Sequence, residues 1–382
     1  MNLDFYTAPH IVLGCGCIQK IGDVACGHGT KALLLHGTAM EEGLLRQVCS
    51  ALKLSHIDVV VHCKPSGEPS PEMVDQAVLD ARRAGCDFVI AIGGGSVIDT
   101  GKAVCGLTPN EGGLEEYLEG VGNGRKMVCS PLPLIAVPTT HGTGAEATCN
   151  AVISSAAAGY KKSFRDKRLM AKEVLIDAEL MTSLPKKSTA DCNMDALTQL
   201  IEAYVSVKAN ALTDALCISG LEAAAEGIVE SFENGDSLKA REKMAYAALM
   251  SGIALSNGGL GAVHGIAPAL GISYGIGHGE SCGLLLDHVM EWNLKFNLER
   301  YAAVGCILTG DTFQMPYQAA VAGVQYVKEL KQCFGIAPDL QFLQIAPEEL
   351  DSIASKVSSN SMSGNPVPMD KDDVKQLLSK LI

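Results

Sequence analysis

The first half of the chain alternates short apolar runs with amphipathic segments. The runs are rich in leucine and β-branched residues and have the length of strands; they span residues 31–37, 56–62, 87–95, 131–140 and 174–177. Segments between them, such as EEGLLRQVCSALK and PEMVDQAVLDARRAG, have helical periodicity. Continuous apolar strands separated by helices indicate a parallel sheet that is covered on both faces. The pattern therefore predicts a doubly wound, nucleotide-binding α/β domain over residues 1–185.

The second half has a different periodicity. Apolar residues recur there at helical spacing, in segments that span residues 191–207, 211–232, 239–256, 317–335 and 372–382. No run in this half has the character of a strand. We therefore expect an all-helical domain over residues 186–382.

The composition indicates which kinds of partner and which cellular compartment to expect. The chain has 382 residues, of which 47% are hydrophobic and 19% charged, and this balance suits two well-buried domains. A net charge of -13 argues against a nucleic-acid partner. No apolar stretch reaches membrane-spanning length, and we read no secretion signal at the N-terminus. The 14 cysteines are mostly scattered singly, so we expect reduced thiols and a cytoplasmic protein.

A glycine loop follows the apolar run at 87–95. Gly94, Gly95 and Ser96 lead into the helical pattern VIDTGKAVCGL. Glycines let the backbone approach an anion closely, Ser96 can cap the helix, and the N–H groups of the first turn favour a phosphate. Asp99 and Lys102 fall on the first turns, where Lys102 could contact a phosphate or face solvent. The loop lacks the usual dinucleotide fingerprint, and a simple strand-to-helix turn is the other interpretation.

A threonine loop, PTTHGTGAE, follows the next apolar run. It lies at the carboxyl end of a predicted parallel strand, where α/β folds bind ligands. The hydroxyls of Thr139, Thr140 and Thr143 could donate hydrogen bonds to a pyrophosphate or a carboxamide. A polar turn that caps a helix is the alternative.

Four residues of the second half are candidate metal ligands. Asp195 and Gln199 are four apart in a helical segment, so both project from one face, and His264 and His278 follow later in the chain. Two imidazoles and a carboxylate can hold Zn²⁺ or Fe²⁺ with coordination positions left open. Such spacing also arises by chance, so by itself it leaves the metal an open question.

The loops and the candidate ligands lie within longer motifs. These motifs occur in the order GGGSVIDTGKA, PTTHGTGAEAT, LIDAELMTSLPKK, MDALTQLIEAY, SNGGLGAVHG and HGESCGLLLDHVMEWN. With this set, the chain resembles the iron-dependent, or group III, alcohol dehydrogenase family over nearly its whole length.

The resemblance implies a dehydroquinate synthase-like architecture and NAD(P)-linked interconversion of small alcohols and aldehydes, with the metal as a Lewis acid. It implies that Asp195, His264 and His278 occupy three of the family's four metal positions and act in catalysis through the metal. The cofactor positions that it implies are Gly94, Gly95 and Ser96 at the pyrophosphate, Asp99 near the nicotinamide, and Thr139, Thr140, Thr143 and Lys162 along the cofactor. Family members commonly form homodimers or larger homo-oligomers.

Two positions depart from the family pattern. Gln199 stands where the fourth ligand is normally a histidine, and its amide oxygen is a weaker donor to Fe²⁺ than imidazole. A related glycerol-oxidising branch manages with an aspartate and two histidines on zinc, so catalysis does not require the missing imidazole. Pro268 stands where many members carry a histidine thought to relay protons. The proton would then pass through the cofactor ribose and water, or through His141.

Cofactor choice depends on the end of the run at 31–37. An aspartate there usually accepts hydrogen bonds from the ribose 2′-hydroxyl of NAD, and this sequence has Gly37. Without a carboxylate a 2′-phosphate is not repelled, which favours NADP(H), although Glu41 and Glu42 nearby could favour NAD.

Three other functions fit parts of the pattern. A glycerol-dehydrogenase-like polyol oxidoreductase stays within the superfamily. A dehydroquinate-synthase-like lyase needs several basic residues for its substrate, and residues 191–280 have only the cluster KAREK. In a metal-free nucleotide-binding pseudoenzyme or scaffold, Gln199 and Pro268 would mark a decayed site.

Overall fold

The computed structural model describes residues 3–155, 157–357 and 360–382. The chain forms two compact units. The sheet unit comprises Thr7–Thr140 and Ala145–Met181, and the helical unit comprises Met1–Tyr6, His141–Gly144 and Thr182–Ile382. The threonine loop therefore belongs partly to each unit. The predicted domain boundary between residues 185 and 186 stays a prediction.

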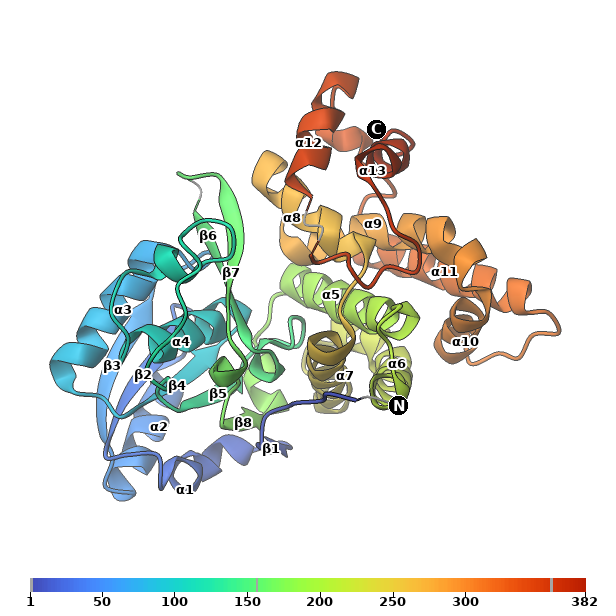
Figure 1. Cartoon of the computed structure of the whole chain (residues 1–382). Helices are drawn as coiled ribbons and strands as arrows, with labels where there is room; N and C mark the ends of the chain where they lie inside the picture. The colour runs from blue at the N-terminus through green and yellow to red at the C-terminus, as the bar shows by residue number, and fades with distance from the viewer. Residues whose placement is uncertain (1–2, 156, 358–359) are drawn as a thin grey trace. The chain divides into compact units, whose positions relative to one another are not determined.

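A six-stranded parallel sheet is the centre of the sheet unit (Figure 1). Its strands lie in the order β1-β8-β5-β4-β2-β3. Their bounds are β1 His10–Leu13, β2 Lys31–Gly37, β3 Asp58–Lys64, β4 Phe88–Gly93, β5 Leu134–Pro138 and β8 Glu173–Ile176. Each of the five predicted runs overlaps one of these strands, and the predicted α/β fold class is confirmed. Strand β1 was not predicted because it has only four residues and its ends are exposed.

Helices cover both faces of this sheet. On one face, α1 (Ile21–Ala25) and α2 (Glu42–Leu54) share a buried core with Leu34 and Ile90. On the other face, α4 (Gly95–Leu107) packs so closely that a Cβ at Gly101 would lie 2.9 Å from the Cβ of Ala91. Helix α3 (Pro71–Ala84) packs beside α4. Both faces are therefore buried, which explains why the central strands β4 and β5 are apolar at every position.

The strand order includes a topological switch between β2 and β4. The chain passes from β2 to its outer neighbour β3 and then crosses back to β4 on the other side of β2. Doubly wound sheets bind their ligands at the carboxyl ends of the strands at such a switch. Gly37 ends β2, and Gly93 of the glycine loop ends β4.

A two-stranded antiparallel hairpin, β6 (Asn150–Ser155) and β7 (Tyr160–Arg165), lies outside the main sheet. The sequence did not predict it, because YKKSFR is polar and lacks an apolar run.

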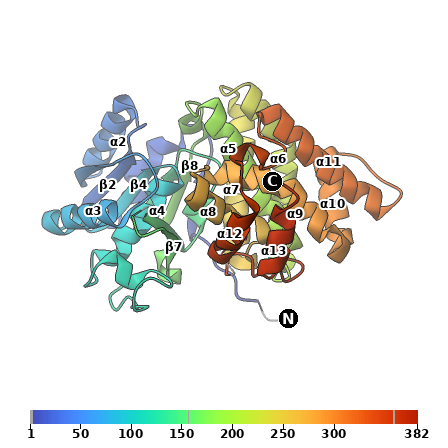
Figure 2. The same ribbon diagram turned by 90° about the horizontal axis from the view of Figure 1, so that it is seen from above.

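The helical unit has no strand among its described residues, in agreement with the predicted helical domain. Its α-helices are α5 Lys186–Val205, α6 Ala211–Glu233, α7 Leu238–Gly258, α8 Ala262–Tyr274, α9 His278–Asn293, α10 Leu298–Thr309, α11 Pro316–Phe334, α12 Leu350–Lys356 and α13 Lys371–Leu378. Helices α8, α9, α10 and α12 were not predicted as separate elements. The short helices α12 and α13 lie against α8 and α9 (Figure 2). No described helix combines the length and the apolar character needed to cross a bilayer.

Candidate functional site

The glycine loop brings the backbone of β4 very close to its neighbours. A Cβ at Gly93 would lie 2.5 Å from Val97 Cγ2, and one at Gly94 would lie 3.0 Å from Thr140 Cγ2. Helix α4 begins at Gly95 with Gly94 as its N-cap, and no described side chain caps it. The prediction that Ser96 caps the helix is therefore wrong, because Ser96 lies inside the first turn. No described side chain accepts a hydrogen bond from the N–H groups of this turn, so they are available to an anionic ligand.

Asp99 and Lys102 form a buried ion pair inside the sheet unit. The Lys102 ammonium donates to Asp99 Oδ1 at 3.1 Å, to Thr148 Oγ1 at 2.7 Å and to the Asn150 carbonyl at 2.9 Å. Asp99 also accepts from the Val152 amide at 3.0 Å. Lys102 is fully buried, so the interpretation that it faces solvent is wrong, and its contact with a phosphate stays a prediction. The pair ties α4 to β6, and the role of Asp99 near the nicotinamide stays a prediction.

The other predicted cofactor residues lie in three places. Gly37, Thr139 and Thr140 lie at the carboxyl ends of the adjacent strands β2 and β5 on either side of β4, and the Thr139 amide donates to the Gly93 carbonyl. Thr143 belongs to the part of the loop that packs in the helical unit. Lys162 is exposed on the hairpin strand β7. The structure therefore brings the glycine loop, Gly37 and two threonines to one edge of the sheet.

Three predicted metal ligands meet inside the helical unit. Asp195 comes from α5, His264 from α8 and His278 from the first position of α9. Asp195 Oδ1 lies 3.2 Å from His264 Nε2 and 3.7 Å from His278 Nε2. Asp195 and His264 are buried, and the His278 side chain is about a quarter exposed. The side chains thus converge from three helices on one buried point.

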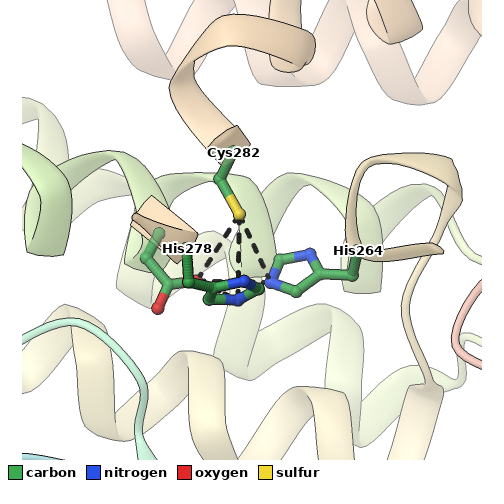
Figure 3. Close-up of side chains that lie close together, drawn as sticks. His264, His278 and Cys282 are labelled. Atoms are coloured by element: carbon green, nitrogen blue, oxygen red, sulfur yellow. Dashed lines mark hydrogen bonds and ion pairs between the residues drawn. The ribbon is translucent and has the colours of Figure 1, made fainter. Parts of the chain in front are cut away.

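A fourth residue, Cys282, completes the group, and the sequence analysis missed it. Its sulfur lies 3.9 Å from Asp195 Oδ1, 3.9 Å from His264 Nε2 and 3.9 Å from His278 Nε2 (Figure 3). The four candidate ligand atoms all lie within 4.8 Å of one another. The signal was present in HGESC, where Cys282 is four residues after His278 and so lies on the same face of α9.

Glu202 holds His264 in place. Its carboxylate accepts from His264 Nδ1 at 2.7 Å and from the Val263 amide at 2.6 Å. With the Nδ1 proton donated to Glu202, Nε2 faces the cluster and is the nitrogen that could bind a metal. Carboxylate partners of this kind fix the tautomer and orientation of metal-binding histidines. The sequence analysis missed Glu202, although it lies seven residues after Asp195 on the same face of α5.

Gln199 is directed differently from the other predicted ligands. Its amide nitrogen donates to Asp195 Oδ1 at 2.9 Å, and its amide oxygen accepts from Ser251 Oγ at 2.7 Å. An amide binds a metal through its oxygen, and this oxygen faces Ser251 of α7.

The electrostatics of the cluster suit a cation. Burial acts to raise the pKa of Asp195, but His278 and His264 outweigh it and hold the pKa below its ordinary value. Burial acts to lower the pKa of His264, but Cys282, Asp195 and Glu202 hold it well above its ordinary value. Burial acts to raise the pKa of Cys282, and the two histidines lower it. The acidic groups thus favour the charged forms that a metal binds.

The donor set therefore fits a divalent metal. Metal–ligand bonds of about 2.0–2.3 Å place the corners of a tetrahedron about 3.3–3.8 Å apart. Five of the six separations between the candidate ligand atoms are 3.2–3.9 Å, close to this size, and all six are within 4.8 Å. Carboxylate, imidazole and sulfur are ligands of iron and zinc.

Two family models match the chain. One, described as iron-containing alcohol dehydrogenase, covers residues 8–178, and the other, described as the C-terminal part of the Fe-containing alcohol dehydrogenase family, covers residues 189–382. The chain belongs to the iron-containing alcohol dehydrogenase family. The predicted family, fold and oxidoreductase class are thereby confirmed.

Relatives agree with this assignment. The chain is 30% identical to the NAD-dependent methanol dehydrogenase of Bacillus methanolicus over 99% of this chain and 100% of that protein. It is 32% identical to the 1,3-propanediol dehydrogenase of Citrobacter freundii over 94% of this chain and 95% of that protein. Among solved structures, an alcohol dehydrogenase from Oenococcus oeni has a TM-score of 0.93 at 30% identity, with both chains fully covered.

His141 and Pro268 bear on proton transfer in this alcohol dehydrogenase. His141 is fully buried, and its Nε2 lies 3.1 Å from Asn193 Oδ1. Burial and the charge of Arg241 lower the pKa of His141 to about 3, so the imidazole is neutral near pH 7. A relay through His141 stays a prediction and would have to use this neutral form. Pro268 lies within α8 and offers no side-chain proton.

Proposed function

We propose that this family member interconverts small alcohols and aldehydes with NAD(P), and that Asp195, His264 and His278 hold its metal. The observation that carries the proposal is the buried convergence of these three side chains from separate helices. A metal held there supplies Lewis-acid polarisation of the substrate oxygen.

Residues of the glycine and threonine loops would bind the cofactor. The uncapped first turn of α4, with Gly94, Gly95 and Ser96, binds the cofactor pyrophosphate, and Thr139 and Thr140 lie at the same edge of the sheet. Thr143, Asp99 and Lys162 contact the cofactor elsewhere, as the family motifs imply.

Iron is the metal that the family name indicates, and zinc suits the same ligands. An aspartate and two histidines are sufficient for zinc in the glycerol-oxidising branch, and the Gln199 amide oxygen is held by Ser251. A glycerol-dehydrogenase-like polyol oxidoreductase is therefore the second candidate. A metal-free scaffold is disfavoured, because such a protein has no need to keep a buried carboxylate between two imidazoles.

We propose that the enzyme uses NADP(H) at least as well as NAD(H). Strand β2 ends at Gly37 without a carboxylate, and Lys64 is its register partner on β3. The ammonium of Lys64 donates to the carbonyls of Pro65 and Gly67, so a cation is fixed beside this strand end. Neither Gly37 nor Lys64 brings a negative charge toward a 2′-phosphate, and the Glu68 carboxylate that acts on Lys64 is itself paired with Lys161 at 3.0 Å. A relative named as NAD-dependent shows that the opposite preference occurs in the family. Comparing kcat/KM with the two cofactors tests the proposal, and a large preference for NAD(H) would overturn it.

We also propose a homodimeric or larger assembly, from the habit of the family, and a reducing compartment such as the cytoplasm. All 14 cysteines are free in the structure, which supports a reducing environment.

One screen tests the proposed function. Protein purified without oxygen would be depleted of metal, reloaded with Fe²⁺, Zn²⁺ or neither, and assayed with short alcohols, diols and aldehydes using each cofactor. We expect aldehyde reduction that depends on added metal. Protein that never binds metal and reduces no aldehyde would instead be a scaffold.

A further inference from the structure

We propose that Cys282 is the fourth protein ligand of the metal and that Gln199, which occupies the ligand position of the family pattern, positions Asp195 instead. The proposal rests on the proposed function, because it concerns the same metal. It changes the centre from an all-nitrogen-and-oxygen set to an Asp-His-His-Cys set.

The first argument is the position of the sulfur. Cys282 Sγ lies 3.9 Å from each of the three other ligand atoms, Asp195 Oδ1, His264 Nε2 and His278 Nε2. Since Zn–S bonds are about 2.3 Å and Zn–N bonds about 2.0–2.1 Å, sulfur and nitrogen ligands on one tetrahedral ion lie about 3.6 Å apart. A small inward movement of side chains on binding would therefore place all four atoms on one metal. Figure 3 shows the sulfur directed at both imidazoles.

The second argument is the set of polar contacts that the buried Cys282 side chain makes. Its sulfur is fully buried and its polar contacts are the three other ligands. Cys217 of α6 is also fully buried in this unit, but it is not in the group of possible ligands. A cysteine that only fills space needs no polar neighbours.

The third argument is the orientation of Gln199. Its amide nitrogen faces Asp195 and its oxygen faces Ser251. The Asp195 carboxylate accepts hydrogen bonds and cannot donate them, so the NH₂ group is the end of the amide that suits it. In this orientation Gln199 braces, from within α5, the same Asp195 oxygen that the two histidines and Cys282 approach, and it does so through its NH₂ group, which is not a metal ligand.

A sulfur ligand would change the chemistry of the centre. A thiolate with the Asp195 carboxylate would balance the charge of a divalent ion, whereas an aspartate with neutral ligands leaves one positive charge. The metal would therefore polarise a substrate oxygen less strongly, and sulfur would favour Zn²⁺ over Fe²⁺ more than the family set does. Zinc can expand to five ligands, so a substrate position is compatible with four protein ligands.

Cobalt(II) absorption tests the assignment without relying on activity. The purified full-length protein would be stripped of metal, loaded with one Co²⁺ per chain and recorded in the near ultraviolet, where thiolate-to-cobalt charge transfer absorbs. We expect the band in wild type and in Gln199→Ala, and its loss in Cys282→Ser. Cys217→Ser is the matched control and should keep the band. Circular dichroism would show that each variant is folded.

The outcomes separate this proposal from the proposed function. A wild-type spectrum without the thiolate band, in a protein that binds Co²⁺ and oxidises alcohols, would overturn the role of Cys282 and leave the function standing. A band that survives in Cys282→Ser would also overturn it. So would a band that disappears in Gln199→Ala, because a Gln199 that only positions Asp195 is not needed to keep the sulfur on the metal. A band without any alcohol oxidation would support the ligand set and overturn the function. Failure to bind metal at all would overturn both.

Discussion

The helices α5 and α9 each present two site residues four apart, but they use the second residue in opposite ways. On α5, Asp195 points to the cluster and Gln199 turns its oxygen to Ser251. On α9, His278 points to the cluster and Cys282 points to it as well. Spacing of four residues therefore identifies a common helix face, whereas the neighbouring helix decides which side chains reach the metal.

The largest effect should come from Asp195 of α5, which His278 and Cys282 of α9 both approach. Replacing Asp195 by Asn removes the carboxylate that lies near both histidines, so we expect loss of bound metal and a fall in kcat/KM of about 10³-fold or more, which corresponds to several kcal/mol. Metal content and steady-state kinetics would measure it. Activity within tenfold of wild type would show that the cluster is not the catalytic centre.

Cys282→Ser should have the next largest effect. Loss of a direct ligand should weaken metal affinity by more than the loss of an outer partner, so we expect a fall of more than about 100-fold in a chelator competition. The selectivity for Zn²⁺ over Fe²⁺ should fall at the same time. Unchanged affinity and selectivity would remove the distinction between α5 and α9.

Glu202→Gln probes the same face of α5 further along the helix. It keeps the size of the side chain but removes the charge that accepts from His264 Nδ1. We expect metal affinity to fall about 10–100-fold, the range for partners of metal-binding histidines. A larger loss than that of Cys282→Ser would mean that orientation of His264 outweighs the sulfur.

Gln199→Ala should cost about tenfold in metal affinity, at the lower end of that range, because it removes one hydrogen bond to Asp195. The double variant with Ser251→Ala should add little, since Ser251 acts through Gln199. A loss from Gln199→Ala that exceeds the loss from Cys282→Ser would reverse the comparison.

The smallest effect concerns His141, which packs against Asn193 elsewhere on α5. Its pKa is about 3 in the folded protein, below the value of about 6.5 for a free histidine, so the unfolded chain binds more protons between these values. Stability due to the neutral imidazole is therefore lost as pH falls. Relative to His141→Gln, wild type should lose about 0.7 kcal/mol of unfolding free energy between pH 7 and 6 in urea titrations. A shifted pH–rate profile in the variant would instead support the proton relay.

Much of this architecture could be predicted from apolar periodicity. The central strands are buried on both faces, so each is a continuous apolar run. Strand β1 and the hairpin β6–β7 were not predicted, because the pairing of short or polar strands depends on their tertiary context more than on their own apolar pattern. Residue type and spacing made Asp195, His264 and His278 candidates, and the resemblance to the family selected them. Cys282 was not a candidate, because a buried cysteine more often fills space, and only the packing of α9 against α5 shows that its sulfur meets the three other candidate ligand atoms.

X-ray absorption at the zinc K edge tests the central claim most directly. Wild type loaded with one Zn²⁺ per chain should show one sulfur neighbour at about 2.3 Å and the remaining nitrogen or oxygen neighbours at about 2.0–2.2 Å. The sulfur should vanish in Cys282→Ser and persist in Gln199→Ala. A wild-type spectrum with only nitrogen and oxygen neighbours would contradict the Asp195, His264, His278 and Cys282 centre.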